Sequence, residues 1–156
     1  MLAQSWQAIG DAPMANQPVA IGNSPQAAKK SARARILVVD DEPLVRWAIG
    51  ETLGDRGYEV TEAGDARSAM HTFLPGACSV DLVLLDLRLP DADDLRVLSA
   101  IRRVSPHTPV IVMTAYGSPE LFTEALRVGA FAVVDKPFEL NALPPLVEGA
   151  LAARPH

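Results

Sequence analysis

From Arg35 onward, the chain alternates between two patterns of hydrophobic and polar positions. Short apolar runs rich in β-branched residues predict strands that are buried on both faces of a sheet. Between these runs, apolar residues recur at the three- and four-residue spacing of a helix with one buried stripe. The expected strands are 36–39, 58–63, 80–85, 109–113 and 131–134.

Residues that favour helix ends divide the remaining segments into five helices. Pro43 suits the first turn of one helix, and Asp65 is a good cap for the next. Ser118 and Pro119 predict a cap followed by a first helical position, and Gly129 predicts the end of that helix. The expected helices are 43–54, 65–73, 95–101, 118–129 and 140–152. Five strands that alternate with five helices predict a doubly wound α/β fold with a parallel sheet.

Residues 1–34 have a different composition, rich in Ala, Gln, Asn, Ser and Pro and without periodicity. This composition predicts a disordered N-terminal tail, followed by one domain over 35–153. No output domain is expected after the last helix, because the chain ends at His156. A single-domain protein is favoured over a fragment of a longer one, because the basic tail lies at the wrong end of the chain for a fused effector.

Charge and hydropathy narrow the classes of function. Residues 1–34 carry three basic side chains and one acid, whereas the other 122 residues carry 11 basic and 18 acidic side chains. A domain with a net charge of −7 is a poor binder of DNA, because phosphate neutralisation needs a basic face. No apolar run is long enough for a membrane span, and Cys78 is the only cysteine. A cytoplasmic location without membrane association is expected.

Polar residues gather at the predicted carboxyl ends of the strands. Asp40 and Asp41 follow the first strand, Asp86 the third and Thr114 the fourth, and Lys136 lies just after the fifth. In doubly wound sheets these ends share one edge, where ligands bind. Clustered carboxylates repel one another unless a cation neutralises them, and hard oxygen ligands favour Mg²⁺. The pattern therefore predicts a magnesium site.

Four segments of the sequence that contain these residues are similar to a known family: ILVVDDEP, DLVLLDLRLPDADDL, VIVMTAYGS and GAFAVVDKPFEL. They resemble the receiver domain of bacterial two-component response regulators, and their sequences are most similar to the nitrogen-regulation branch of that family. The acidic pair, the Asp, the Thr and the Lys-Pro follow in order, at separations of 46, 28 and 22 residues. The resemblance implies the flavodoxin-like receiver fold with strand order 2-1-3-4-5.

The resemblance also implies the metal ligands. Asp41 and Asp86 would bind Mg²⁺ directly, together with the backbone carbonyl of Arg88. Asp40 would hold a metal-bound water. All the protein ligands are therefore oxygen atoms, as Mg²⁺ prefers.

Asp86 is, by the same resemblance, the phosphoacceptor. Thr114 would hydrogen-bond the phosphoryl group, and Lys136 would pair with the same group. The peptide bond between Lys136 and Pro137 would be cis, which would direct the lysine inward. The donor would be phosphohistidine on a sensor histidine kinase or a histidine phosphotransfer protein, and the output a downstream protein partner. Such a domain takes part in its own phosphorylation and slow dephosphorylation but is not a turnover enzyme.

Two departures from the family concern its output face, which consists of the fourth helix, the fifth strand and the fifth helix. Val133 stands where the family usually has an aromatic residue. Pro144 and Pro145 are expected to delay the last helix to about Pro144, with 139–143 as an irregular lead-in. A short last helix offers less surface for a symmetric dimer, so a monomer is expected.

Two other functions compete with this interpretation. A small aspartyl-phosphate hydrolase would have its nucleophile at the end of the first strand, but such enzymes usually place a second Asp where Glu42 stands. A receiver-like interaction module without phosphorylation is favoured mildly by Val133. The acids, Thr114 and Lys136 argue against it.

Overall fold

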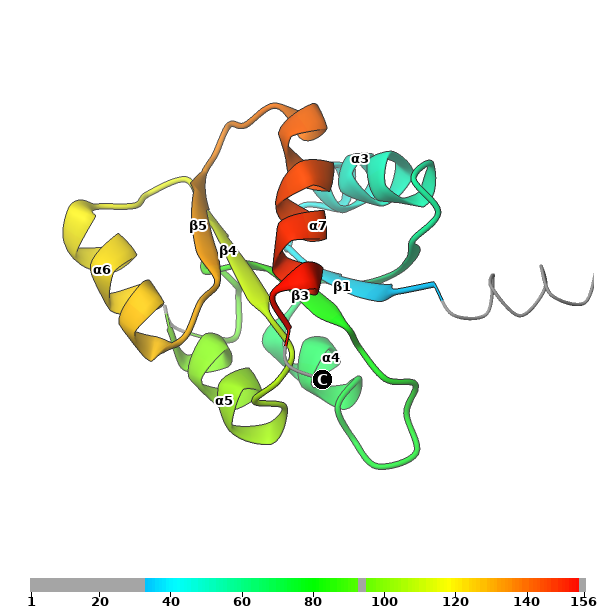
Figure 1. The fold of residues 1–156 in the computed structure, drawn as a ribbon. Coiled ribbons are helices and arrows are strands. Elements are labelled where there is room, and N and C mark those ends of the chain that lie inside the picture. The colour runs from blue at the N-terminus through cyan, green and yellow to red at the C-terminus, as the bar shows by residue number, and fades with distance from the viewer. Residues whose placement is uncertain (1–32, 93–94, 155–156) are drawn as a thin grey trace, which may run out of the picture. The chain divides into compact units, whose positions relative to one another are not determined.

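The computed structural model describes residues 33–92 and 95–154, and from Ala34 onward these belong to one compact unit, Ala34–His156. Its centre is a parallel sheet with the strand order β2-β1-β3-β4-β5 (Figure 1). The strands are β1 (Arg35–Val39), β2 (Glu59–Ala63), β3 (Leu82–Asp86), β4 (Val110–Thr114) and β5 (Ala132–Asp135). The order confirms the flavodoxin-like arrangement that the family resemblance implied.

In the part of the chain that the structure describes, five α-helices connect the strands and cover both faces of the sheet. They are α3 (Pro43–Gly54), α4 (Ala66–His71), α5 (Arg96–Val104), α6 (Pro119–Val128) and α7 (Leu143–Ala152), with a 3₁₀ turn, η2 (Leu140–Ala142), before the last. Helices α3 and α7 lie on one face, and α4, α5 and α6 lie on the other. This is the three-layer arrangement that alternating strands and helices predict.

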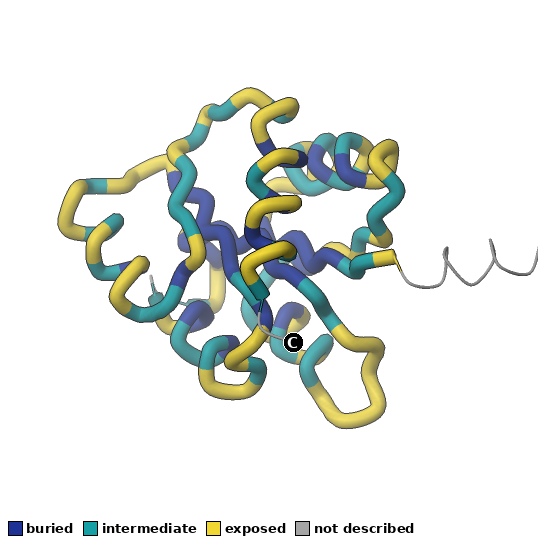
Figure 2. Tube along the Cα trace, in the orientation of Figure 1, coloured by how far each residue is buried: buried dark blue, intermediate teal, exposed yellow. Residues whose placement is uncertain are grey.

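Each face of the sheet has its own apolar core, because successive strand residues point to opposite faces. On β1, Leu37 and Val39 pack toward α4 and α5, whereas Ile36 and Val38 pack toward α3 and α7. β3 and β4 are buried over their whole length. The buried residues therefore concentrate in the middle layer, as Figure 2 shows.

Local signals for helix ends are confirmed where the chain supplies its own hydrogen bonds. The Ser118 hydroxyl accepts a hydrogen bond from the N–H of Leu121 at 3.1 Å and caps α6. Gly129 ends that helix with a φ of 124°, in the region that favours glycine. Helix α4 is shorter than the expected 65–73 and ends at His71, although Asp65 caps it as predicted.

Strand starts and the last helix show how proline shifts an element. β4 begins at Val110 rather than at Pro109, which lacks an N–H for the ladder. Without a proline, β2, β3 and β5 also begin later than expected, at Glu59, Leu82 and Ala132, and β1 begins one residue earlier, at Arg35. Helix α7 begins at Leu143, which confirms the delayed start, but the segment before it contains a 3₁₀ turn instead of being irregular. The predicted N-terminal tail lies outside the described residues up to residue 32.

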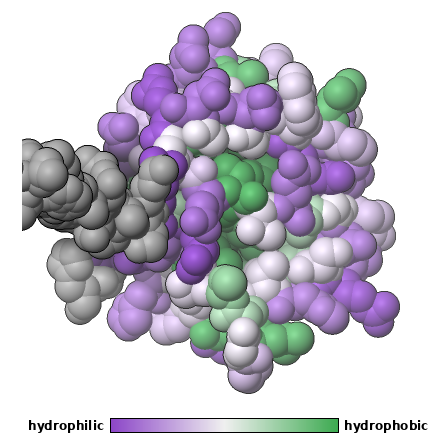
Figure 3. Space-filling view, turned by 90° about the vertical axis from the view of Figure 1, so that its right-hand side faces the viewer, coloured by the Kyte–Doolittle hydropathy of each residue, from purple (hydrophilic) through white to green (hydrophobic). Residues whose placement is uncertain are grey.

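The surface combines hydrophilic side chains with a smaller apolar area. Figure 3 looks at the side of the molecule that is on the right in Figure 1 and shows hydrophobic side chains gathered in a central patch with hydrophilic ones around them. Within residues 33–92 and 95–154, no helix has the length and hydropathy that a membrane span requires.

The central strand tests the core. Leu84 of β3 is fully buried, so Leu84→Ala is expected to lower the free energy of unfolding by about 2–5 kcal/mol. Leu126→Ala is the matched control, because Leu126 is 51% exposed; it should change stability by less than about 0.5 kcal/mol. Urea denaturation measures both, and equal losses would contradict the assigned core.

Candidate functional site

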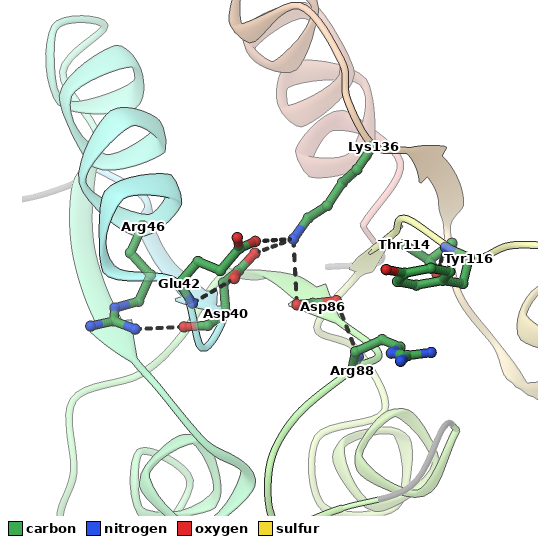
Figure 4. Close-up of polar contacts among 8 residues, drawn as sticks. All are labelled: Asp40, Glu42, Arg46, Asp86, Arg88, Thr114, Tyr116 and Lys136. Carbon is green, nitrogen blue, oxygen red and sulfur yellow. Dashed lines mark hydrogen bonds and ion pairs between the residues drawn. The ribbon is translucent and has the colours of Figure 1, made fainter.

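The carboxyl ends of the strands bring the candidate residues to one edge of the sheet. Asp40 directly follows β1, Asp86 and Thr114 are the last residues of β3 and β4, and Lys136 directly follows β5. Asp40, Asp86 and Thr114 are 0%, 4% and 1% exposed. Because the preceding strands are packed on both faces, these side chains leave a rigid frame, and Figure 4 shows Asp40, Asp86 and Lys136 converging.

Asp40 has a hydrogen-bond partner at every polar group. One carboxylate oxygen accepts from the N–H of Glu42 at 2.9 Å, and the other accepts from Lys136 Nζ at 2.6 Å. Its main-chain N–H donates to the carbonyl of Ala63 at 3.1 Å, and its own carbonyl accepts from Arg46 Nη1 at 2.6 Å. These hydrogen bonds offset the free-energy cost of burying the Asp40 side chain away from water.

Lys136 places one positive charge among several negative ones. Besides Asp40, its Nζ lies 3.5 Å from Glu42 Oε1 and 3.4 Å from Asp86 Oδ2. Partial burial works against the charged form, but the hydrogen bond from Lys136 to Asp40 and the charge of Asp86 outweigh it and raise the pKa of the lysine. The peptide bond to Pro137 is cis, as the resemblance implied.

The surroundings of Asp86 disfavour its charged form, whereas those of Lys136 favour the charged form of the lysine. Burial raises the pKa of its carboxyl, and this effect exceeds the lowering by the N–H of Arg88 and by the charge of Lys136. The N–H of Arg88 donates to Asp86 Oδ1 at 3.1 Å. One oxygen of Asp86 thus contacts a main-chain donor, while the other faces Lys136.

Asp41 completes a group of three carboxylates. Asp40, Asp41 and Asp86 each offer one oxygen atom, and these atoms lie within 4.8 Å of one another. Asp40 and Asp86 are buried, whereas Asp41 is exposed. An arrangement of three carboxylate oxygens this close suits a hard divalent cation, with the exposed side left for water.

Thr114 lies at the opposite side of Asp86 from Asp40 (Figure 4). Its hydroxyl accepts a hydrogen bond from the N–H of Tyr116 at 3.2 Å, and its carbonyl accepts one from the N–H of Lys136 at 2.8 Å. The guanidinium of Arg88 lies over the Tyr116 ring, 4.2 Å from the ring centre. This distance allows a cation–π contact.

Sequence reasoning thus identified the residues that meet at this edge but missed several of their partners. Arg46, Tyr116 and the side chain of Arg88 were not singled out, because no spacing in the sequence indicates their contacts. The structure brings together Asp40, Asp41, Asp86 and Lys136. The predicted role of the Arg88 carbonyl stays a prediction, since the recorded contact of this residue with Asp86 is through its N–H.

The family that this fold and site indicate is confirmed by comparison with known proteins. Residues 36–148 match the response regulator receiver domain, so the chain belongs to the receiver domains of two-component response regulators. Phosphorylation on an aspartate is general in this family, whose members interact with histidine kinases and downstream effectors.

Individual relatives agree. The chain is 43% identical over 117 residues to the regulatory protein AtoC of Escherichia coli (strain K12), covering 75% of this chain and 25% of AtoC. It is 35% identical to the transcriptional regulatory protein PdtaR of Mycobacterium tuberculosis (strain H37Rv), covering 76% of this chain and 57% of PdtaR. The receiver domain of NtrX from Brucella abortus superposes with a TM-score of 0.69 at 36% identity, covering 76% and 98% of the two chains. The chain thus spans between a quarter and somewhat over half of these two curated relatives.

The burial of Asp86 leads to a prediction about stability. A raised pKa in the folded state means that ionised Asp86 destabilises the fold at any pH above its folded pKa. In metal-free buffer at neutral pH, Asp86→Asn should therefore raise the free energy of unfolding. The gain should disappear as the pH falls below the ordinary pKa of an aspartate, where the carboxyl is protonated in both states.

Urea denaturation across this pH range measures the effect. Asp55→Asn, at an exposed position, makes the same change in net charge and should leave stability nearly unchanged. A loss of stability in Asp86→Asn at neutral pH would show that the bonds from Lys136 and Arg88 outweigh the burial.

Proposed function

We propose that this domain accepts a phosphoryl group on Asp86, with Mg²⁺ as cofactor, from phosphohistidine on a sensor histidine kinase or a histidine phosphotransfer protein. The observation that carries the proposal is the juxtaposition of three carboxylates with one ammonium group. Lys136 lies within hydrogen-bond reach of Asp40 and 3.4 Å from Asp86. Membership in the receiver family supports the same assignment.

The residues at this edge fit Mg²⁺. The donor set is carboxylate oxygen, and the three candidate oxygens lie within 4.8 Å of one another. Asp41 and Asp86 would hold the ion directly with the carbonyl of Arg88, and Asp40 through a water. Each carboxylate oxygen of Asp40 accepts one hydrogen bond, from Glu42 or from Lys136. The lone pairs that remain can accept a hydrogen bond from that water. When bound, Mg²⁺ supplies the positive charge that offsets the phosphoryl oxygens.

The reaction is a phosphoryl transfer between two side chains. A carboxylate oxygen of Asp86 attacks phosphorus, so that a new P–O bond forms while the P–N bond of the donor phosphohistidine breaks. The electron pair leaves with the imidazole, which takes up a proton. Lys136 would move from the carboxylates toward the incoming oxygens, and the Thr114 hydroxyl would donate to one of them.

Asp40 is a poor candidate for the nucleophile of a hydrolase. Its carboxylate is fully buried and already accepts hydrogen bonds from Glu42 and Lys136. Asp86 is also buried, but its hydrogen bonds from Arg88 and Lys136 are longer, at 3.1 and 3.4 Å, so its oxygens are held less tightly than those of Asp40. This difference supports Asp86 as the acceptor in a protein that is modified once rather than turning over a substrate.

An interaction module that is never phosphorylated is also less well supported. Such a module has no need for a lysine at hydrogen-bond distance from a fully buried aspartate. The geometry of Lys136, Asp40 and Asp86 is what a phosphoryl acceptor requires. Val133 is half-buried and packs against the core on the α5–α6 side of the sheet, where it serves the fold in the place of an aromatic residue.

The proposed output is docking of a downstream protein partner in the cytoplasm. The domain from Arg35 onward carries 11 basic and 18 acidic side chains, which counts against direct DNA binding by this domain. The face expected to change comprises α6, β5 and α7. On it, α7 spans ten residues and begins only at Leu143.

Intact mass spectrometry tests the acceptor. Incubation with acetyl phosphate and Mg²⁺ is expected to add one phosphoryl group, and a chelator should prevent the addition. Asp86→Asn should abolish labelling and keep the fold, because amide and carboxylate have nearly the same shape. Lys136→Ala should slow labelling by roughly a hundredfold, the usual loss on removing one donor to a developing negative charge.

Asp91→Asn is the matched control for the acid, because the Asp91 carboxylate accepts from the N–H groups of Ala66 and Arg67 at the start of α4, away from the cluster. It should label at the wild-type rate. Labelling of Asp86→Asn at that rate would refute the acceptor, and sustained release of phosphate from an added ester would favour the hydrolase.

The late start of α7 leads to a prediction about assembly. Because α7 offers only the stretch from Leu143 to Ala152, the phosphorylated domain is expected to stay a monomer. Light scattering with and without beryllofluoride, a phosphoryl mimic, measures this. A stable dimer that forms only with the mimic, and is lost when a charge on the exposed part of α7 is reversed (Glu148→Lys), would contradict it.

A further inference from the structure

Arg46 on α3 contacts the acidic cluster through the main chain rather than through a carboxylate of the cluster. Its Nη1 donates to the backbone carbonyl of Asp40 at 2.6 Å, and its Nε donates to Glu62 Oε1 on β2 at 3.1 Å. The side chain is only 19% exposed. A guanidinium bonded at two edges has one well-defined position, and Figure 4 shows it reaching Asp40 from the side opposite to Lys136.

The carbonyl that Arg46 binds belongs to the peptide between Asp40 and Asp41. A peptide unit is planar, so fixing this carbonyl also fixes the N–H of Asp41 and the direction in which the chain leaves β1. The preceding peptide is held as well, because the N–H of Asp40 donates to the carbonyl of Ala63 at 3.1 Å. The position of the Asp41 carboxylate therefore depends on a main-chain turn that Arg46 holds in place.

We infer that Arg46 is a positioning residue for Asp41 and thereby sets the Mg²⁺ affinity of the site, an inference that rests on the function proposed above. Charge and position have opposite effects here. If the guanidinium acted only through its charge, removing it would strengthen Mg²⁺ binding, because like charges repel. If it acts by holding the peptide, removing it weakens binding. The sign of the change separates the two.

Titration of the 156-residue chain with Mg²⁺, followed by ¹H–¹⁵N NMR shifts, measures whether a substitution weakens or strengthens Mg²⁺ binding. Arg46→Gln is expected to weaken binding about tenfold, a typical loss when the support of a metal ligand is removed. Arg46→Lys keeps the charge but has no fork to bridge Asp40 and Glu62, so it should fall between that variant and the wild type. Arg56→Gln makes the same change in charge at an exposed position and should bind Mg²⁺ as the wild type does.

A second variant moves the guanidinium without removing it. A Cβ at Gly64 would lie 3.1 Å from Arg46 Nη1, and Gly64 has no backbone angle that requires glycine. Gly64→Ala should therefore displace the guanidinium by a few tenths of an ångström and weaken Mg²⁺ binding at unchanged net charge. This variant decides the matter if Arg46→Gln does not fold.

Equal or tighter Mg²⁺ binding by folded Arg46→Gln would overturn the inference, as would wild-type affinity in both Gly64→Ala and Arg46→Lys. In either case the wild type still responds to Mg²⁺, so the proposed function stands. A wild-type spectrum that Mg²⁺ does not change would overturn the metal site of the proposed function and this inference together.

Discussion

The ammonium group of Lys136 lies 2.6, 3.5 and 3.4 Å from carboxylate oxygens of Asp40, Glu42 and Asp86, and much of the site depends on this contact. Three negative charges around one positive charge leave an excess that burial makes more costly. The surroundings limit this cost. Asp40 has a donor on each carboxylate oxygen, and Asp86 accepts from a main-chain N–H. The remaining excess of negative charge suits the site to a divalent cation.

The apolar sheet makes such crowding possible. β3 and β4 are buried along their whole length, and their last residues are Asp86 and Thr114. The backbone of a residue at the end of a packed strand cannot move away from its neighbours without breaking the sheet ladder. The repulsion between carboxylates is thus held in place by the hydrophobic burial of two cores, one on each face of the sheet.

Sequence reasoning succeeded where the determining interactions are local or periodic. The apolar runs predicted five strands, and the Ser118 cap and Gly129 end of α6 were confirmed because each depends on neighbouring residues. The site residues were grouped correctly, since the carboxyl ends of parallel strands always share an edge. The length of α4 and the first residues of the five strands were not predicted correctly, because packing and ladder register decide where an element begins and ends.

The sequence alone therefore determined the fold class and which acids, hydroxyl and lysine meet at the sheet edge. Only the tertiary structure decided how they are held: Arg46 bonds to the carbonyl of Asp40, Arg88 lies over Tyr116, and Asp91 binds the first N–H groups of α4. These contacts join an arginine or acid to a main-chain atom or a ring on another element. Side-chain periodicity indicates which face a residue occupies, but a long side chain reaches its partner only after packing has fixed the distance between elements.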